Sequence, residues 1–363
     1  MATRMSVWRL VAAVVPCVGG VAALTERGRF GDAPEWVGGK TVYEVNLRQF
    51  SKGADVAGFR GELGRLKELG VGVLWFMPVH PIGLEGRSGE LGSPYAARDF
   101  RGFSSELGTV AEFKEMVEAA HRLGMYVVMD WVANHTALEH PRVKQHPGWY
   151  TRDAAGELVH PMPEWKDVAD LNFASAEMRR EMIATMEYWV REVGVDGFRC
   201  DAAELVPLDF WVEARGALWK VKPVLMLAEG VKPELMEYAF DAAYAWDLSP
   251  NMEGIVDGSK NPGDLVNYIL ADGRVVPKGG IRLNFATNHD KNAWEATAGE
   301  QLGRGLEAFT VLTFTLPGVP LVYNGQEAGL DKRLNFFARD PIVWRKDAMA
   351  GLYRDLAQLR REN

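Results

Sequence analysis

The sequence contains only two cysteines, Cys17 and Cys200, among 363 residues. Two cysteines so far apart do not form a disulfide framework, and no CxxC or clustered Cys/His spacing indicates a zinc site. The chain also lacks an excess of basic charge, because its formal net charge is −8. That balance argues against nucleic acid and anionic membrane surfaces as partners, whereas a neutral substrate is compatible with it.

Long uninterrupted hydrophobic runs are absent as well. The apolar run at the N-terminus, LVAAVVPCVGGVAAL (10–24), is broken by a proline and a pair of glycines. It is therefore too short and too broken to span a bilayer. Two arginines precede it, and VAA (21–23) fits a small-residue cleavage site. This pattern predicts a secretory signal peptide over residues 1–23 and an exported protein. The alternative is a poorly structured N-terminal extension on a cytoplasmic protein.

Strand-like apolar runs alternate with helix-period segments along the rest of the chain. The predicted strands cover residues 41–47, 71–78, 125–132, 197–201, 224–229, 240–245, 281–290 and 319–325. Continuous apolar strands are typical of a parallel sheet buried on both faces. Eight strand–helix units predict an α/β fold, a closed (β/α)8 TIM barrel. No GxGxxG follows the first strand, which disfavours a doubly wound dinucleotide-binding sheet.

One connection is too long to be an ordinary loop. Residues 136–172 are rich in histidine, proline and tryptophan and show neither a strand nor a helix period. Structureless connections of this length are uncommon in compact domains. We therefore predict a small inserted subdomain after the third strand, with the barrel formed by residues 36–135 and 173–363.

Four of the predicted strands lead into a carboxylate. These carboxylates are Asp130, Asp201, Glu229 and Asp290. A single acid at a strand end usually caps a helix or lies in a loop. In a parallel barrel, however, the carboxyl ends of all strands converge on one face, where active sites are built. Four acids from four strands therefore predict an active site.

An arginine lies close to one of these acids. Arg199 and Asp201 are two residues apart on a strand, so they point to the same side, while Cys200 points to the helices and acts as a small buried hydrophobe. We expect the guanidinium to lower the pKa of Asp201 and keep it ionised, which suits a nucleophile. No charged residue occurs in the four positions before Glu229. That setting predicts a raised pKa, which suits a general acid.

Two histidines and a tyrosine complete the candidate site. His135 and His289 follow strand ends, and Tyr95 lies in the loop after the second strand. The sequence has no HxH pair or HExxH motif, so contact with substrate hydroxyls is favoured over metal ligation. Glycoside hydrolysis is a reaction that uses paired carboxylates and needs no cofactor.

Several short motifs resemble those of the α-amylase family of retaining glycoside hydrolases. The four central ones are DWVANH (130–135), GFRCDAAE (197–204), LAEG (227–230) and FATNHD (285–290). Three flanking segments are also similar: GVGVLWFMPVHPIG (70–83), DLNF (170–173) and GVPLVYNGQEAGL (318–330). The motifs occur in the family's order, and the resemblance covers about residues 36–363. It implies that residues 136–172 are the family's domain B.

The resemblance assigns roles to the four best-placed residues. It implies a retaining mechanism in which Asp201 is the nucleophile and Glu229 is the general acid/base. Asp290 is then the third carboxylate, which binds the distorted sugar and stabilises the transition state. Arg199 orients and ionises Asp201.

The remaining site residues receive supporting roles from the same resemblance. His135 and His289 contact hydroxyls of the sugar being cleaved, and Tyr95 stacks beneath that sugar. Asp130 and Asn134 support the site structurally.

The sequence departs from the family pattern in two places. Many members carry Lys-His after the nucleophile motif, where the histidine helps to hold calcium, and this chain has Glu204-Leu205. Asn134 and Asp170 are of a type that ligates calcium, but two residues are too few to predict a metal site. Many members also continue into a C-terminal β-sandwich, whereas this sequence stops after the helix predicted at 348–361. We expect the surface that such a domain covers to be exposed and apolar.

The resemblance therefore implies hydrolysis of α-1,4-glucosidic bonds in starch, maltodextrins or related α-glucans. An α-glucan transglycosylase or isomerase with the same triad is the first alternative. A catalytically inactive glucan-binding relative is the second, although such proteins usually lose one of the carboxylates. The expected partner is an α-glucan or maltooligosaccharide, with no nucleic acid and no membrane insertion of the mature chain. The oligomeric state is not predicted.

Overall fold

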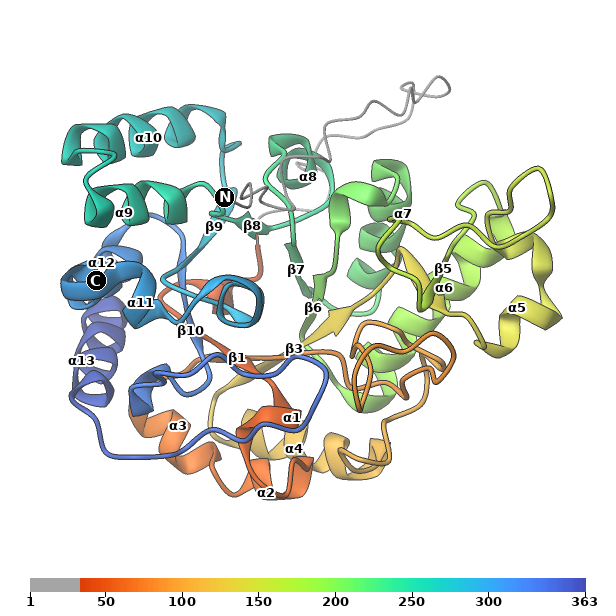
Figure 1. Cartoon of the computed structure of the whole chain (residues 1–363), viewed down its shortest axis with the longest axis horizontal. Helices are drawn as coiled ribbons and strands as arrows, with labels where there is room; N and C mark the ends of the chain where they lie inside the picture. Colours follow the sequence, from red (N-terminus) through yellow and green to blue (C-terminus); the bar gives the residue numbers. More distant parts are fainter. Residues whose placement is uncertain (1–32) are drawn as a thin grey trace.

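The computed structural model describes residues 33–363, so the predicted signal peptide lies outside the described residues. Eight parallel strands close into a barrel in the order β1-β10-β9-β8-β7-β6-β3-β2 (Figure 1). Their bounds are β1 Val42–Val45, β2 Val73–Phe76, β3 Tyr126–Trp131, β6 Gly197–Cys200, β7 Leu225–Ala228, β8 Ala242–Tyr244, β9 Ile281–Phe285 and β10 Val319–Tyr323. The prediction of a (β/α)8 barrel is confirmed.

Helices surround the barrel, and several begin at a side chain that caps them. The helices outside the inserted segment are α1 Leu47–Phe50, α2 Val56–Arg60, α3 Leu63–Leu69, α4 Val110–Arg122, α6 Ala176–Tyr188, α7 Leu208–Trp219, α8 Pro233–Tyr238, α9 Leu248–Asp257, α10 Pro262–Val275, α11 Ala298–Leu302, α12 Leu306–Thr315 and α13 Ala348–Glu362. Thr109 accepts a hydrogen bond from the N–H of Glu112 at the start of α4, and Ser175 does the same for Met178 in α6. These bonds satisfy backbone donors that have no partner within the helix.

Side chains of the strands alternate between two apolar cores. The inner core fills the barrel and contains Val42, Val73, Trp75, Leu225, Leu227, Tyr244, Leu283, Phe285 and Leu321. The outer core lies between barrel and helices and contains Tyr43, Leu74, Val127, Met129, Phe198, Cys200, Met226, Ala228 and Val322. Cys200 is fully buried in the outer core, as predicted. A Cβ at Gly197 would overlap the backbone of Leu225, so this glycine allows β6 and β7 to pair closely.

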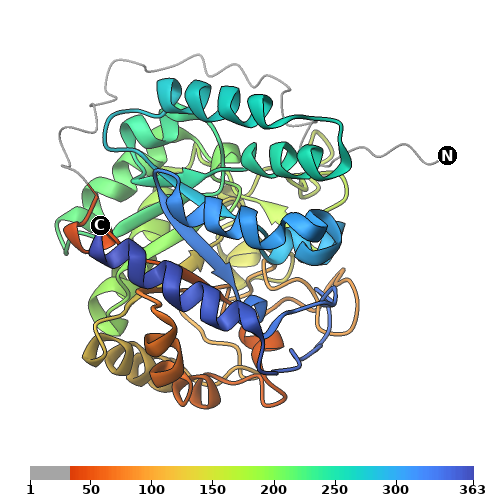
Figure 2. The ribbon, with the colours of Figure 1, turned by 90° about the vertical axis from the view of Figure 1, so that its left-hand side faces the viewer.

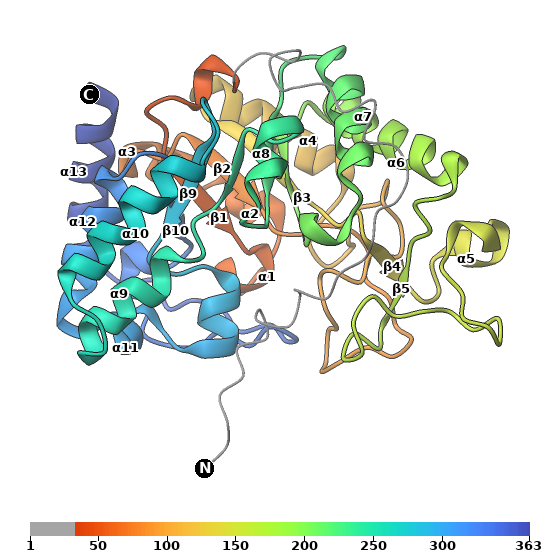
Figure 3. The same cartoon turned by 90° about the horizontal axis from the view of Figure 1, so that it is seen from above.

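The inserted segment carries a small sheet of its own. Strands β4 (His135–Ala137) and β5 (Val168–Asp170) pair antiparallel, with His135 opposite Asp170. A short helix, α5 (Pro141–Gln145), lies between them in the chain. Figures 1 and 3 show this segment projecting at one side of the barrel, away from α9–α13. The segment that the sequence left without a period is thus partly β-structure.

The opposite flank exposes apolar side chains. Figure 2 shows α13 lying across this flank, with α9 and α10 further along it. The exposed apolar side chains of these helices and α12 are Val256, Val266, Leu270, Val275, Val311 and Leu359. None of the helices in residues 33–363 is long and apolar enough to cross a membrane.

A buried ion pair ties α7 to the start of the strands. Arg215 donates from Nη1 to Oδ2 of Asp241 at 2.6 Å and from Nη2 to Oδ1 at 2.8 Å. Asp241 also accepts from the backbone N–H of Met226 in β7. Both side chains are buried. The pair is bidentate, and the loss of either charge would remove a buried ion-pair partner from the other.

Replacing Arg215 by methionine should therefore be strongly destabilising. We expect Arg215→Met to lower the free energy of unfolding by about 3–5 kcal/mol, measured by urea denaturation. The matched control is Arg191→Met, which removes an exposed ion pair with Glu187 and should cost under about 1 kcal/mol. Equal losses in the two variants would show that the buried pair does not stabilise the barrel.

Candidate active site

The carboxyl ends of the strands bring the predicted acids together around Arg199. Its Nη1 lies 2.9 Å from Oδ1 of Asp130 and 3.0 Å from Oδ1 of Asp201. Its Nη2 lies 3.0 Å from Oε1 of Glu229, although not aligned for a hydrogen bond. Asp290 lies next to this cluster and contacts His289. The distance between Nε2 of His289 and Oδ2 of Asp290 is 3.3 Å. The structure therefore gathers all four carboxylates at one end of the barrel.

Aromatic side chains enclose the guanidinium of Arg199. Its central carbon lies 5.2 Å from the ring centroid of Trp75, 5.7 Å from Tyr95 and 5.5 Å from Tyr244. Its Nε donates to the hydroxyl of Tyr244 at 3.0 Å. The side chain is 0% exposed, so these rings and the carboxylates replace the water that would otherwise solvate the cation.

Asp130 lies on β3 opposite Arg199 and is fully buried. It accepts hydrogen bonds from Arg199, from Nε1 of Trp75 at 3.2 Å and from the hydroxyl of Tyr95 at 3.2 Å. Burial raises the pKa of Asp130 to about 6, and Arg199 opposes that rise. With three donors around its two oxygens, this carboxyl fixes the positions of Arg199 and Tyr95.

The pKa of Asp201 differs from the sequence-based expectation. Burial raises it to about 6, because loss of solvent outweighs the lowering effect of Arg199, and Asp130 and Asp290 raise it further. The lowering effect expected from Arg199 is therefore present, but it is smaller than the effect of burial. The sequence shows the guanidinium but not the depth of burial. Near neutral pH Asp201 is still ionised, since about 6 lies below 7.

Glu229 has a higher pKa than Asp201, as expected, and burial is the main cause. Burial raises it to about 8, Arg199 lowers it, and Asp201 and Asp290 raise it again. The four residues before Glu229 in the chain do not describe its surroundings, because Arg199 reaches it from the neighbouring strand. At a pH between these two pKa values, Glu229 is protonated and Asp201 is ionised. Glu229 can then act as the acid and Asp201 as the nucleophile.

Backbone atoms of the loop after β6 hold Glu229 in place. The N–H of Ala202 donates to Oε2 of Glu229 at 2.7 Å, and the N–H of Ala203 donates to its carbonyl oxygen at 3.1 Å. Ala202 has a φ of +41°, in the left-handed region that non-glycine residues rarely adopt,. This strained conformation points its N–H at the carboxyl group.

Glu204 lies where many members of the family that the motifs resemble have lysine. Its carboxylate binds the backbone of the loop that follows Glu229. Its Oε1 accepts from the backbone N–H groups of Val231 at 2.7 Å and Lys232 at 3.0 Å. A Cβ at Gly230 would lie 2.8 Å from Cγ of Glu204, so the glycine allows the close approach. The Glu204 carboxylate thus joins the β6 loop to the loop that follows Glu229.

His289 connects three other groups of the site. Its Nδ1 bonds the carboxylate of Glu44 on β1, and its Nε2 is 2.8 Å from the Tyr95 hydroxyl oxygen. Burial lowers the pKa of His289, but Asp290 and Glu44 outweigh burial and raise it to about 9. The ring is then protonated at neutral pH, with Nε2–H donating to Tyr95 while the Tyr95 hydroxyl donates to Asp130.

His135 and its neighbours lie at the edge of the inserted segment. His135 is buried, and burial lowers its pKa to about 4, so the ring is neutral. Its Nδ1 is 3.3 Å from Nδ2 of Asn134. Asp170 lies opposite His135 in the β4–β5 pair. Within residues 33–363, no three His, Cys, Asp or Glu side chains gather in a way that could hold a metal ion.

Sequence reasoning missed several residues that build the site. Glu44, Trp75 and Tyr244 each contact a predicted residue, and Phe336 lies parallel to Tyr95 with ring centroids 6.1 Å apart. Glu44 left a signal, because it is a charged residue inside the apolar strand TVYEVNL. Phe336 left none, since its position depends on the fold of the long connection between β10 and α13.

Comparison with known proteins agrees with this architecture. The family description "Alpha amylase, catalytic domain" matches residues 45–155 and 147–215. The structure of a noncanonic maltogenic α-amylase from Thermotoga neapolitana is 37% identical, with a TM-score of 0.84, covering 90% of this chain and 77% of that one.

Two curated relatives are similar in sequence. The α-amylase MalA of Haloarcula japonica is 30% identical over 91% of this chain, and the match spans 50% of that protein's length. A 4-α-glucanotransferase of Thermotoga maritima is 27% identical, covering 83% of this chain and 76% of its own.

A closed parallel barrel with buried carboxyl groups at the carboxyl ends of its strands is the architecture of a (β/α)8 enzyme. The chain belongs to the α-amylase family of glycoside hydrolases, the family that its motifs resemble.

The raised pKa of Glu229 has a consequence for stability. Its folded-state pKa of about 8 exceeds the ordinary value, so the folded state keeps a proton that the unfolded state loses as the pH rises. This group therefore destabilises the fold progressively from about pH 4.5 to pH 8. Glu229→Gln removes the effect, so its melting temperature relative to the wild type should increase between pH 5 and pH 8.

The control is Glu118→Gln, which changes an exposed glutamate on α4. Its melting temperature relative to the wild type should stay constant over the same pH range. A Glu229→Gln difference that is independent of pH, or that decreases as the pH rises, would contradict the raised pKa.

Proposed function

We propose that this chain is a retaining α-glycosidase that cleaves α-1,4-glucosidic bonds of starch, maltodextrins or related α-glucans. One observation carries the proposal. The carboxyl groups of Asp201 and Glu229 both contact the guanidinium of Arg199, and their pKa values differ. Asp201, at about 6, is the nucleophile, and Glu229, at about 8, is the general acid/base. Retaining glycosidases use such a pair.

The reaction proceeds in two displacements. In the first, an Asp201 oxygen bonds to the anomeric carbon while Glu229 transfers its proton to the departing glycosidic oxygen. The product is a covalent glycosyl-enzyme. In the second, ionised Glu229 takes a proton from water, whose oxygen attacks the anomeric carbon and releases Asp201. Both residues return to their starting protonation states, and neither step needs a cofactor.

The other residues of the site hold the sugar between these two groups. The side chain of Asp290 is 19% exposed and lies beside protonated His289. It can bind sugar hydroxyls there and stabilise the positive charge that develops on the sugar ring. Tyr95 stacks beneath the sugar, and neutral His135 contacts its hydroxyls. Arg199 keeps Asp201 oriented, with Asp130 and Asn134 as support.

The names of the relatives support an α-glucan as substrate. They are compatible with two reactions, hydrolysis and glucan transfer. Two relatives are named α-amylases and one a 4-α-glucanotransferase. A transferase would use the same glycosyl-enzyme and pass it to a sugar hydroxyl instead of water. An inactive glucan-binding protein is disfavoured because all three carboxylates are present and held by specific contacts.

We also propose that residues 1–23 direct export and that residues 136–172 form the inserted domain B. The test of export is the N-terminal sequence of protein secreted by a host that expresses the full chain. A mature protein that begins near residue 24 supports export, and an intact N-terminus on intracellular protein contradicts it.

Removing either reacting carboxylate should abolish turnover. We expect Asp201→Asn and Glu229→Gln each to lower kcat on maltoheptaose by about 10³-fold or more. Circular dichroism should show that both variants remain folded. Substantial residual activity in either variant would overturn the assignment of that residue.

The stereochemistry of the first product tests the double displacement. Proton NMR of a fresh digest should show the α anomer before mutarotation, because two inversions restore the starting configuration. Initial release of the β anomer would exclude Asp201 as a covalent nucleophile.

A product profile on starch, pullulan, cyclodextrin and maltotriose separates hydrolysis from transfer to another sugar. Products longer than the substrate would favour the transferase.

A further inference from the structure

Glu44 is a buried carboxylate on β1 that the mechanism above does not use. Its side chain is 0% exposed, and within residues 33–363 its only ion pair is the one with Nδ1 of His289. The second carboxylate oxygen, Oε2, is also buried and has no hydrogen-bond partner in the described part of the chain. A buried carboxylate without a partner is costly. The charge of Glu44 therefore depends on His289.

The other nitrogen of the His289 ring faces two groups that the proposed function places against the sugar. Nε2 lies 2.8 Å from the hydroxyl oxygen of Tyr95 and 3.3 Å from Oδ2 of Asp290. The imidazole thus separates Glu44 from these two groups. Asp290 is partly exposed, whereas no solvent reaches Glu44. The attraction between Glu44 and the ring is therefore little screened by water or salt.

Both signs of charge face the imidazole of His289. Burial lowers its pKa, Asp290 and Glu44 raise it, and Arg199 on β6 lowers it again. Asp130 on β3 faces the ring across the Tyr95 hydroxyl. Burial raises the pKa of each tyrosine in this region, so that all of them are neutral: Tyr95, Tyr244 on β8 and Tyr323 on β10. Glu44 and Asp290 are therefore the anions in contact with the ring.

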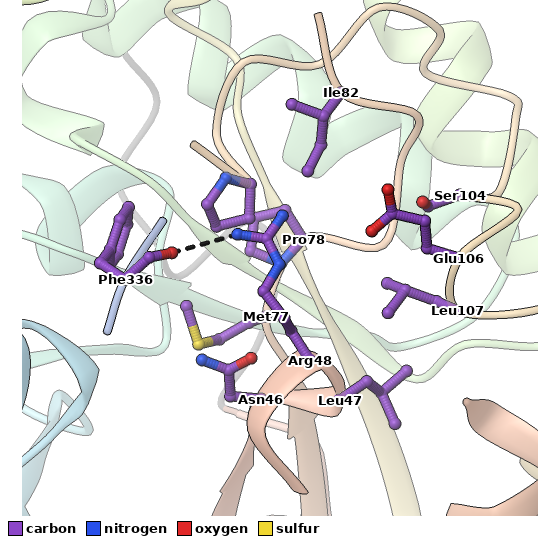
Figure 4. Close-up of a pocket in the computed structure, with 11 residues that line it drawn as sticks. Asn46, Leu47, Arg48, Met77, Pro78, Ile82, Ser104, Glu106, Leu107 and Phe336 are labelled. Carbon is purple, nitrogen blue, oxygen red and sulfur yellow. Dashed lines mark hydrogen bonds between the residues drawn. The ribbon is translucent and has the colours of Figure 1, made fainter. Parts of the chain in front are cut away.

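The position of Tyr95 is fixed by contacts that do not involve His289. Arg48 is buried and donates from Nη1 to the carbonyl oxygen of Gly92, in the loop before Tyr95, at 2.9 Å. The same Nη1 donates to the carbonyl oxygen of Phe336 at 3.1 Å (Figure 4). The Phe336 ring lies parallel to Tyr95, with centroids 6.1 Å apart. A change of charge on the imidazole would therefore change the hydrogen bonds of Tyr95 and leave its ring in place.

The charge of His289 sets the direction of a hydrogen-bond chain. When the ring is protonated, Nε2–H donates to Tyr95, and the Tyr95 hydroxyl donates to Asp130 at 3.2 Å. When the ring is neutral and Nδ1–H faces Glu44, Nε2 has only a lone pair to offer. The Tyr95 hydroxyl then turns to Nε2, and Asp130 loses one of its donors.

We propose that Glu44 is a positioning residue for the reaction: its carboxylate keeps the His289 ring protonated, and the protonated ring orients the Tyr95 hydroxyl and supplies a positive charge beside Asp290. Glu44 acts through His289 and does not touch the substrate. The importance of this arrangement for turnover rests on the proposed function. The link between Glu44 and His289 is independent of the reaction that the protein catalyses.

An NMR titration of the imidazole measures this link directly, with the His289 signal assigned as the one missing from His289→Asn. In the wild type it should titrate at about pH 9. Glu44→Gln should lower this pKa by about 1–3 pH units, because the amide oxygen still accepts from Nδ1–H but carries no charge. Glu44→Asp keeps the charge and should restore most of the wild-type value. The matched control is Glu327→Gln, which neutralises another buried glutamate, bonded to Tyr43 and Arg65, and should leave the titration unchanged.

The pH dependence of kcat/KM on maltoheptaose measures the consequence for turnover. The ratio of this constant in Glu44→Gln to that in the wild type should fall about tenfold between pH 6 and pH 8, because the ring of the variant loses its proton in this interval. A purely structural contribution of Glu44 would lower the constant by the same factor at every pH. Glu327→Gln should show a constant ratio.

The outcomes separate this proposal from the glycosidase assignment. A wild-type His289 that titrates at about 6.5 or below would overturn the role of Glu44, even if Glu44→Gln does not fold. An unchanged His289 pKa in Glu44→Gln, or a loss of activity that is uniform with pH, would also overturn it while a wild type that cleaves maltoheptaose remains a glycosidase. A lowered His289 pKa in a protein whose wild type cleaves no α-glucan would support the link and overturn the glycosidase.

Discussion

The site depends on one buried cation. Arg199 is the guanidinium that three carboxyl groups share, and none of these four side chains is more than slightly exposed. One positive charge cannot offset three negative ones in a medium of low polarity. Burial and the mutual repulsion of the acids therefore favour a retained proton on one of them near neutral pH. Glu229, which has the highest pKa of the three, is the acid that retains it.

The order of the strands explains why one arginine can reach all three acids. Strand β6 lies between β3 and β7, and Arg199 is paired in register with Asp130 on one side and with Leu227 on the other. Asp201 and Glu229 follow at the ends of β6 and β7. Neighbouring strands are separated by about 5 Å, a distance that a guanidinium can bridge in both directions. A sheet with another strand order would have separated these groups.

The sequence was sufficient for the barrel and the acids, but not for their energetics. Alternating apolar runs predict the eight strands, and the position of an acid at a strand end predicts convergence. The net rise in the pKa of Asp201 was not predicted, because burial, which dominates it, cannot be read from adjacent residues. Phe336 carried no pattern at all. The position of its segment depends on hydrogen bonds from Arg48 and Gln49, nearly 300 residues away in the chain.

The left-handed conformation of Ala202 has a consequence for how this position can evolve. The contact with Glu229 comes from the main-chain N–H, which every residue except proline possesses. Selection at position 202 therefore acts on a dihedral angle and not on side-chain chemistry. Residues that tolerate positive φ can replace one another there without loss of the donor, whereas β-branched residues shift the backbone and misdirect it. A position of this kind can vary in identity among descendants and still be under strict constraint.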